Sequence, residues 1–170
     1  MTIVTASCDA HILGHNLTFL FKMSGTRVKI SPMLNGLTLL VVDDNEAHNY
    51  ALSKSLQAVG ANVISAHSGT ETLALARKKP DVVLLDVNLP DLNGFEVCRR
   101  LKADPETKDI AVIFISATYQ DPNSKALAQS VGAETYLFHP VDKEQLLAII
   151  QGQIHRSLNS PRHKADSATE

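Results

Sequence analysis

From Leu37 onward, short apolar runs alternate with longer amphipathic stretches, and the alternation repeats five times. The runs are almost continuously apolar, as in "LTLLVV" and "IAVIFIS", and do not alternate between apolar and polar positions. Continuous apolar strands are typical of a parallel sheet that is covered on both faces. The runs lie at 37–42, 62–66, 81–86, 110–116 and 135–138, and the amphipathic stretches lie at 45–60, 68–79, 94–103, 122–131 and 142–158.

The alternation predicts an α/β fold: a doubly wound, five-stranded parallel sheet with helices on both faces, joined by right-handed crossovers. In such sheets the functional crevice lies outside the carboxyl ends of the strands. Ser68 followed three residues later by Glu71 is a capping box, which predicts the start of the second helix. The expected inner face of the first helix consists of Ala47, Ala51, Leu52, Leu56 and Val59.

Both ends of the chain lie outside this pattern. We expect residues 1–36 to be an N-terminal extension that is disordered or a non-native start, because Met23 and Met33 both precede the first predicted strand. The segment before that strand carries the Gly, Ser, Pro and Asn residues that are typical of a linker. The predicted domain spans residues 37–157, and residues 158–170 are expected to be a disordered tail.

Composition narrows the class of protein. Of the 170 residues, 44% are hydrophobic and 20% are charged, and the formal net charge is −2, so no basic footprint for nucleic acid is expected. No apolar run approaches the roughly 20 residues that a membrane helix needs. The two cysteines, Cys8 and Cys98, form no CxxC motif, which favours a reducing, cytoplasmic setting.

Polar and charged residues follow the predicted strands. Asp43 and Asp44 end the first strand, Asp86 the third, Ser116 the fourth and His139 the fifth. The first and third strands are neighbours in a doubly wound sheet, so the three carboxylates should converge. Two like charges at ~4 Å cost about 4 kcal/mol at an effective dielectric of 20. Either one carboxylate is protonated or a cation lies among them, and oxygen ligands in an open site favour Mg²⁺.

Successive segments resemble the motifs of the receiver domain of bacterial two-component response regulators, in the same order. They are "VVDDNE", "VVLLDVNLPDLNGFEV", "FISA" and "VGAETYLFHP", and the resemblance covers Leu37 to Ile154. The resemblance implies a flavodoxin-like (βα)5 receiver sandwich. It also implies a phosphoprotein that takes part in phosphorelay signal transduction.

The resemblance implies roles at the acidic end of the sheet. Asp86 is similar to the phospho-acceptor of the family and would also be a metal ligand. Asp44 resembles the direct Mg²⁺ ligand, and Asp43 resembles the carboxylate that holds the ion partly through water. The backbone carbonyl of Asn88 would be a further ligand. No other cofactor is implied.

Three further residues match positions that the family uses for switching. Ser116 resembles the switch hydroxyl and Tyr136 the switch aromatic. His139 stands in place of the lysine that precedes the proline after the fifth strand. Imidazole is shorter than the lysine side chain and loses its charge near neutral pH. The replacement affects how strongly phosphorylation at Asp86 would change the conformation of other parts of the domain. It is equally well explained as a histidine that is tolerated after the site lost its lysine.

We therefore predict a single-domain response regulator. A sensor histidine kinase or phosphotransfer protein donates a phosphoryl group to Asp86 in the presence of Mg²⁺, and an unidentified downstream protein reads the surface of the fourth helix, fifth strand and fifth helix. The chain would be no enzyme beyond its own phosphorylation and dephosphorylation. The sequence leaves open a homodimer through the fourth and fifth helices, and it indicates no nucleic-acid or membrane partner.

The sequence also allows two alternative functions from other classes of protein. The first is a degenerate receiver that binds proteins independently of phosphorylation, for which His139 is the only support in the sequence. The second is an enzyme or flavin carrier on the same fold, which the acidic, glycine-free loop "DDNEAHN" disfavours. Four other histidines resemble ordinary surface residues: His48, His67, His155 and His163.

Overall fold

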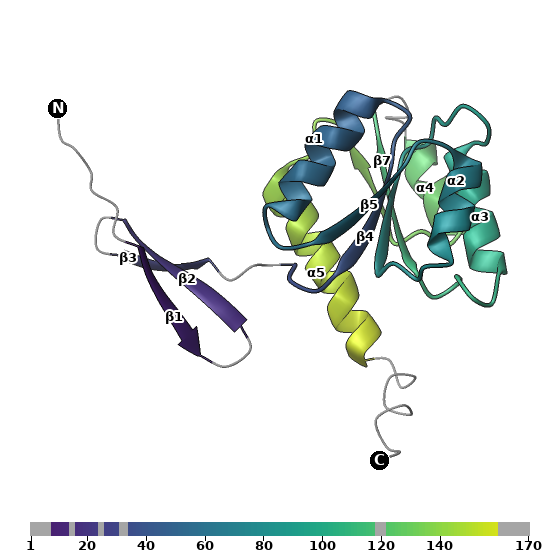
Figure 1. The fold of residues 1–170 in the computed structure, drawn as a ribbon. Helices are drawn as coiled ribbons and strands as arrows, with labels where there is room; N and C mark the ends of the chain where they lie inside the picture. Colours follow the sequence, from purple (N-terminus) through teal and green to yellow (C-terminus); the bar gives the residue numbers. More distant parts are fainter. Residues whose placement is uncertain (1–7, 14–15, 24–25, 31–33, 118–121, 160–170) are drawn as a thin grey trace, which may run out of the picture.

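The computed structural model describes residues 8–13, 16–23, 26–30, 34–117 and 122–159 (Figure 1). Five parallel strands form the main sheet, in the order β5-β4-β6-β7-β8. They are β4 (Thr38–Val42), β5 (Asn62–Ala66), β6 (Val82–Leu85), β7 (Ala111–Ser116) and β8 (Thr135–Phe138). All four pairings between them are parallel, so the predicted doubly wound sheet is confirmed.

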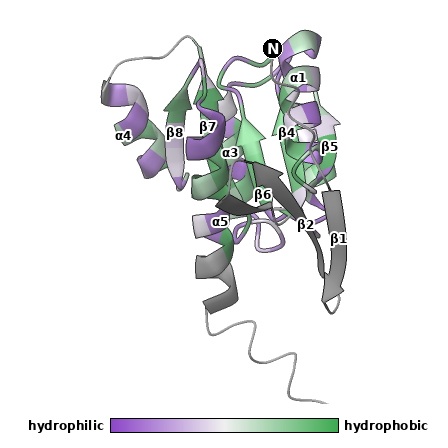
Figure 2. Cartoon of the chain, turned by 90° about the vertical axis from the view of Figure 1, so that its left-hand side faces the viewer, coloured by the Kyte–Doolittle hydropathy of each residue, from purple (hydrophilic) through white to green (hydrophobic). Residues whose placement is uncertain are grey.

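Five helices cover the two faces of this sheet. They are α1 (Glu46–Gln57), α2 (Gly69–Ala76), α3 (Gly94–Ala103), α4 (Pro122–Ser130) and α5 (Lys143–Asn159). Side chains of α1 and α5 share one buried cluster with the sheet, and side chains of α2, α3 and α4 share the other. In Figure 2 the hydrophobic colour accordingly concentrates on the central strands. Among the described residues, no helix has the length and hydrophobicity that crossing a membrane requires.

The predicted inner face of the first helix is confirmed in part, because Leu52, Leu56 and Val59 pack into the buried cluster on this side of the sheet. Ala47 and Ala51 are exposed, and the buried residues are Asn49, Ser53 and Leu56. The amide Nδ2 of Asn49 donates to the carbonyl oxygens of Ala66 at 3.0 Å and Val41 at 3.3 Å, and Ser53 Oγ donates to Asn49 Oδ1 at 3.3 Å. The start of α1 covers strand ends whose carbonyls need donors, so a polar face is buried there.

The start of the second helix follows the prediction with one difference. Ser68 is its N-cap, and Ser68 Oγ accepts from the backbone N–H of Glu71 at 3.2 Å. Glu71 Oε2 accepts at 2.7 Å from the backbone N–H of His67, one residue before the cap. Both interactions satisfy backbone donors at the helix end, as a capping box does.

The folded unit begins three residues earlier than predicted. Leu34 is completely buried in the cluster beneath α1 and α5. Its backbone N–H donates to the carbonyl of Val59 at 3.1 Å, and its carbonyl accepts from the N–H of Leu37 at 3.1 Å. Residue 34 therefore belongs to the core and not to the extension.

The N-terminal extension contains regular structure that the sequence analysis did not predict. β1 (Cys8–Leu13), β2 (Asn16–Met23) and β3 (Thr26–Ile30) form a separate antiparallel sheet. That the N-terminal extension is a non-native start stays a prediction. At the other end α5 continues to Asn159, and the predicted tail beyond it lies outside the described residues.

Candidate functional site

Three carboxylates meet at the carboxyl ends of β4 and β6. The sheet register pairs Val42 with Leu85, so the next residues, Asp43 and Asp86, follow at the same level. Carboxylate oxygens of Asp43, Asp44 and Asp86 lie within 4.8 Å of one another. Only 13% of the Asp43 side chain is exposed, whereas Asp44 is exposed. The geometry confirms the predicted convergence and supplies hard oxygen ligands that could hold a divalent cation.

The surroundings of Asp86 include some groups that raise the pKa of its carboxyl group and others that lower it. Burial raises the pKa of this carboxyl above its ordinary value, and the nearby charge of Asp43 raises it further. Hydrogen bonds from the backbone N–H of Val87, the Ser116 side chain and the backbone of Asn88 act the other way. The Val87 N–H donates to Asp86 Oδ1 at 2.7 Å. A cation among the carboxylates would favour the ionised form of Asp86.

Ser116 and Tyr136 lie on the adjacent strands. Ser116 ends β7, is completely buried and forms a side-chain hydrogen bond with Asp86. Tyr136 in β8 is buried, with its ring centroid 5.8 Å from that of Phe114 and 5.1 Å from that of Phe138. Ser116 is therefore within hydrogen-bonding distance of Asp86, and Tyr136 lies inward among aromatic rings.

Two histidines contact Asp43 and a third, His139, stacks on one of them; the sequence analysis singled out only His139. The ring of half-buried His139 stacks on that of His48 in α1, with centroids 5.7 Å apart. His48 Nδ1 lies 3.7 Å from Asp43 Oδ2. His67 Nδ1 lies 3.1 Å from the backbone carbonyl oxygen of Asp43. The first turn of α1 directly follows the Asp43-Asp44 pair, and this spacing could have identified His48.

Asp91 in the loop after Asp86 forms hydrogen bonds with the first residues of α2. Its Oδ1 accepts from the backbone N–H groups of Gly69 at 2.7 Å and Leu92 at 2.9 Å. Its Oδ2 accepts from Thr70 twice, from the hydroxyl at 2.6 Å and from the N–H at 2.8 Å. These bonds, the Thr70 hydroxyl first, hold the pKa of the Asp91 carboxyl well below its usual range.

Replacing Asp91 by asparagine is expected to make the thermal stability of the protein depend less on pH in the acid range. Because its pKa is lower in the folded state, the stabilisation is present above the unfolded value near 4 and is lost as pH falls toward the folded value. Wild type should therefore lose thermal stability more steeply than Asp91→Asn between about pH 5 and pH 3. Thermal melts over this pH range test the prediction. Glu144→Gln is the control, because Glu144 is exposed. Parallel curves for wild type and Asp91→Asn would contradict the assignment.

Gly94 allows the backbone of Asp86 and Val87 to pass close to the start of α3. A Cβ atom at Gly94 would meet the carbonyl oxygen of Asp86 and would lie 2.9 Å from the Cα of Val87. Both are backbone atoms, so relief would require a shift of the segment that carries Asp86. The N–H of Gly94 also donates to the Val87 carbonyl at 2.8 Å.

Gly94→Ala is expected to destabilise the fold by about 1–3 kcal/mol, as overpacking does, and to displace Asp86. Gly152→Ala is the matched control, because a Cβ there meets nothing within 4 Å in the middle of α5. The control should be stabilised by about 0.4–1 kcal/mol. Urea unfolding of both variants measures the difference, and equal stability of Gly94→Ala and wild type would show that the segment accommodates the methyl group.

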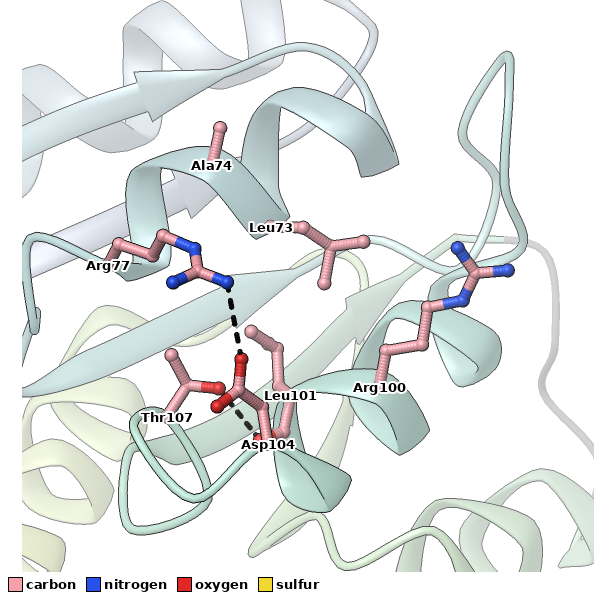
Figure 3. Close-up of a pocket in the computed structure, with 7 residues that line it drawn as sticks. All are labelled: Leu73, Ala74, Arg77, Arg100, Leu101, Asp104 and Thr107. Carbon is pink, nitrogen blue, oxygen red and sulfur yellow. Dashed lines mark hydrogen bonds and ion pairs between the residues drawn. The ribbon is translucent and has the colours of Figure 1, made fainter.

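A separate hollow of about 280 Å³ lies between α2 and α3 (Figure 3). Leu73, Ala74 and Leu101 line its apolar part. Its two guanidinium groups already have acidic partners. Arg77 pairs with Asp104 at 3.6 Å and Glu106 at 2.9 Å, and Arg100 donates to Glu96 at 2.7 Å. None of the predicted site residues lines this hollow, and its charges balance without a ligand.

Comparison with known protein families identifies the family of this chain, and the result is consistent with the carboxylate cluster at the carboxyl ends of β4 and β6. The family model of the response regulator receiver domain matches residues 39–151. The chain belongs to this family. Receiver domains are signalling domains, and the strand order and acidic cluster of this chain are those of a receiver.

Curated relatives of this receiver include both short and long proteins. Protein PilH of Pseudomonas aeruginosa is 42% identical over 113 residues, which is 66% of this chain and 93% of PilH. The regulator RpaA of Synechocystis is 35% identical over 73% of this chain, and response regulator PleD of Caulobacter vibrioides is 40% identical over 66%. The matched region spans 52% of RpaA and 25% of PleD, so both are longer proteins.

Solved structures share the fold of this receiver. A response regulator receiver domain from Clostridium thermocellum matches 71% of this chain and 96% of its own, with a TM-score of 0.65 and 31% identity. The chemotaxis protein CheY4 of Vibrio cholerae matches 68% of this chain and 97% of its own, with a TM-score of 0.63 and 32% identity.

Proposed function

We propose that this receiver accepts a phosphoryl group on Asp86, with Mg²⁺ held by Asp43, Asp44, Asp86 and the backbone carbonyl of Asn88. The observation that carries the proposal is the cluster of three carboxylates within 4.8 Å, one of which is hydrogen-bonded to the buried Ser116. The donor set is made of oxygens, which fits Mg²⁺. When bound, the ion would shield the attacking carboxylate and the charge on the transferring oxygens.

In the proposed reaction, a carboxylate oxygen of Asp86 attacks the phosphorus of a phosphohistidine. The P–N bond breaks, the leaving imidazole takes up a proton, and an aspartyl phosphate forms. Ser116 at the end of β7 would then donate its hydroxyl hydrogen to a phosphoryl oxygen. The donor is a sensor histidine kinase or a phosphotransfer protein, as befits the family of the chain.

The proposed output runs from Ser116 through the ring of Tyr136 to α4, β8 and α5. Lys125 of α4 places its Nζ 5.2 Å from the centroid of Phe138, which in turn contacts Tyr136. Leu127 of α4 is 46% exposed, so an apolar side chain is available to a downstream protein. A movement of Tyr136 would thus change the packing beneath this surface.

His139 supports a second candidate function. It stands where the family has lysine, and its ring stacks on His48. If this arrangement does not support switching, the chain is a degenerate receiver that binds partners independently of phosphorylation. Phosphoryl uptake in the presence of Mg²⁺ separates the two functions.

Asp44→Ala is expected to weaken Mg²⁺ binding by about tenfold or more, because a direct carboxylate ligand is removed. NMR or fluorescence titration of the full chain measures the affinity. Glu106→Ala is the control, since this exposed carboxylate pairs with Arg77 beyond the carboxyl end of α3 and should leave Mg²⁺ binding unchanged. Equal Mg²⁺ affinity in Asp44→Ala and wild type would refute the assigned ligand.

A further inference from the structure

The two faces of the N-terminal sheet, formed by β1, β2 and β3, differ in composition. Directly opposed residues of an antiparallel pair share a face, and so does every second residue along a strand. The register opposes Cys8 to Phe21 and Phe21 to Val28, and it therefore assigns every residue of the sheet to one of two faces. The first, here called the apolar face, consists of Cys8, Ala10, Ile12, Leu17, Phe19, Phe21, Met23, Thr26, Val28 and Ile30.

The apolar face carries no charged residue, and Thr26 is its only polar one. On the other face, here called the polar face, only Leu13 and Leu20 are hydrophobic. A sheet with this division can keep its polar face in water, whereas its apolar face must pack against another surface. The remaining residues of the polar face are Asp9, His11, Asn16, Thr18, Lys22, Arg27 and Lys29.

The receiver domain of the same chain does not provide that surface. Within the described part of the chain, β1, β2 and β3 pack on one another and make no extended contact with a helix or strand of the receiver (Figure 1). The match to the receiver family begins only at residue 39, so a receiver completes its fold without such a sheet.

We propose that the apolar faces of two copies of this chain pack on each other, so that the two N-terminal sheets form a six-stranded sandwich that holds two receivers together. Antiparallel sheets pack face to face in this way, about 10 Å apart. An uncharged, hydrophobic face is complementary to itself, as the interface of a two-fold symmetric dimer requires. The proposal does not depend on phosphorylation of Asp86.

The size of the apolar face suits a dimer of moderate affinity. The three strands have 6, 8 and 5 residues. With about 3.4 Å per residue and about 4.8 Å between strands, the face measures roughly 14 by 20 Å. Two such faces bury on the order of 1,000 Å² of accessible surface in total, which is near the lower limit of a specific interface. We therefore expect a dissociation constant in the micromolar range.

Two other arrangements agree less well with the composition of the sheet. Pairing of two sheets through their edges would leave both apolar faces in water, and the edge strand β3 carries Arg27 and Lys29, which disfavour the addition of a strand. A membrane surface against the apolar face would leave Lys22, Arg27 and Lys29 on the side away from the lipid headgroups.

Sedimentation velocity of the full chain at about 1–200 µM, with EDTA and without a phosphodonor, tests the proposal in the micromolar range. Wild type should change from monomer to dimer as the concentration rises. Phe19→Ala should weaken the dimer by at least about tenfold, because Phe19 lies in the middle strand, opposite Ala10 and Ile30. Leu20→Ala is the matched control, since the next residue of the same strand lies on the polar face, and its dimer should match that of wild type.

Hydrogen exchange distinguishes loss of the dimer from loss of the sheet. Amide exchange in β1, β2 and β3 should slow as the wild-type concentration rises, and Phe19→Ala should reach the same protection at higher concentration. A full chain that stays monomeric throughout would overturn the proposal. So would a dimer that Phe19→Ala leaves unchanged, one that Leu20→Ala weakens equally, or one that gives these strands no added protection.

Discussion

A chain that begins at Leu37 is expected to be less stable than one that begins at Met33 by about 2–5 kcal/mol, the usual cost of deleting a buried leucine. The difference is the loss of Leu34, which is completely buried between the sheet and its α1 and α5 layer. The hydrogen bond from the backbone N–H of Leu34 to the Val59 carbonyl is lost as well. Such a change is a large part of the 5–15 kcal/mol that stabilises a typical domain.

The chain that begins at Met33 keeps Leu34 and should melt within a few degrees of the full chain, because all five strands of the parallel sheet and all five helices come after residue 33 in the sequence. Within the full chain, Leu34→Ala should reproduce most of the loss. Leu127→Ala is the matched control, since Leu127 is 46% exposed. Urea unfolding measures the stability of the full chain, the two shortened chains and the two variants. Equal stability of Leu34→Ala and Leu127→Ala would show that Leu34 packs differently.

The sheet and the carboxylate cluster could be predicted from sequence because two simple regularities determine them. Continuous apolar runs indicate strands buried on both faces, and parallel pairing brings strand ends to one edge. Asp43 and Asp86 each follow the last residue of a strand, and the register that pairs Val42 with Leu85 aligns them. To predict the acidic cluster, the only long-range feature that must be known is the strand order.

Features that depend on contacts between distant segments were missed. Asn49 and Ser53 face inward because strand carbonyls need donors, whereas a search for apolar faces selects Ala47 and Ala51. Leu34 is a single apolar residue in a linker-like segment, and its burial depends on α1 and α5.

The contact between His48 and His139 joins elements that are far apart in sequence, so no local pattern could reveal it. The strands β1–β3 had a local signal that was overlooked. Leu17, Phe19 and Phe21 alternate with other residues along β2, which is the period of a strand.

Asp86→Asn is expected to abolish phosphoryl uptake completely, because an amide oxygen carries no negative charge and is a poor nucleophile toward phosphorus. The same variant should remain folded. Burial raises the pKa of Asp86, so the folded state disfavours its charge, and the neutral amide should leave stability equal or higher when Mg²⁺ is absent. A thermal melt of both proteins without Mg²⁺ provides this control. A large loss of stability in Asp86→Asn would mean that the charge itself is needed for folding.

The most direct test of the account is intact-protein mass spectrometry after treatment with a small phosphodonor and Mg²⁺. Wild type should gain the mass of a single phosphoryl group, the gain should disappear when Mg²⁺ is chelated, and Asp86→Asn should gain nothing. A gain that persists in Asp86→Asn would contradict the assignment of the acceptor. No gain in wild type, under conditions where Mg²⁺ binds through Asp44, would contradict the phosphorylation switch and favour the degenerate receiver.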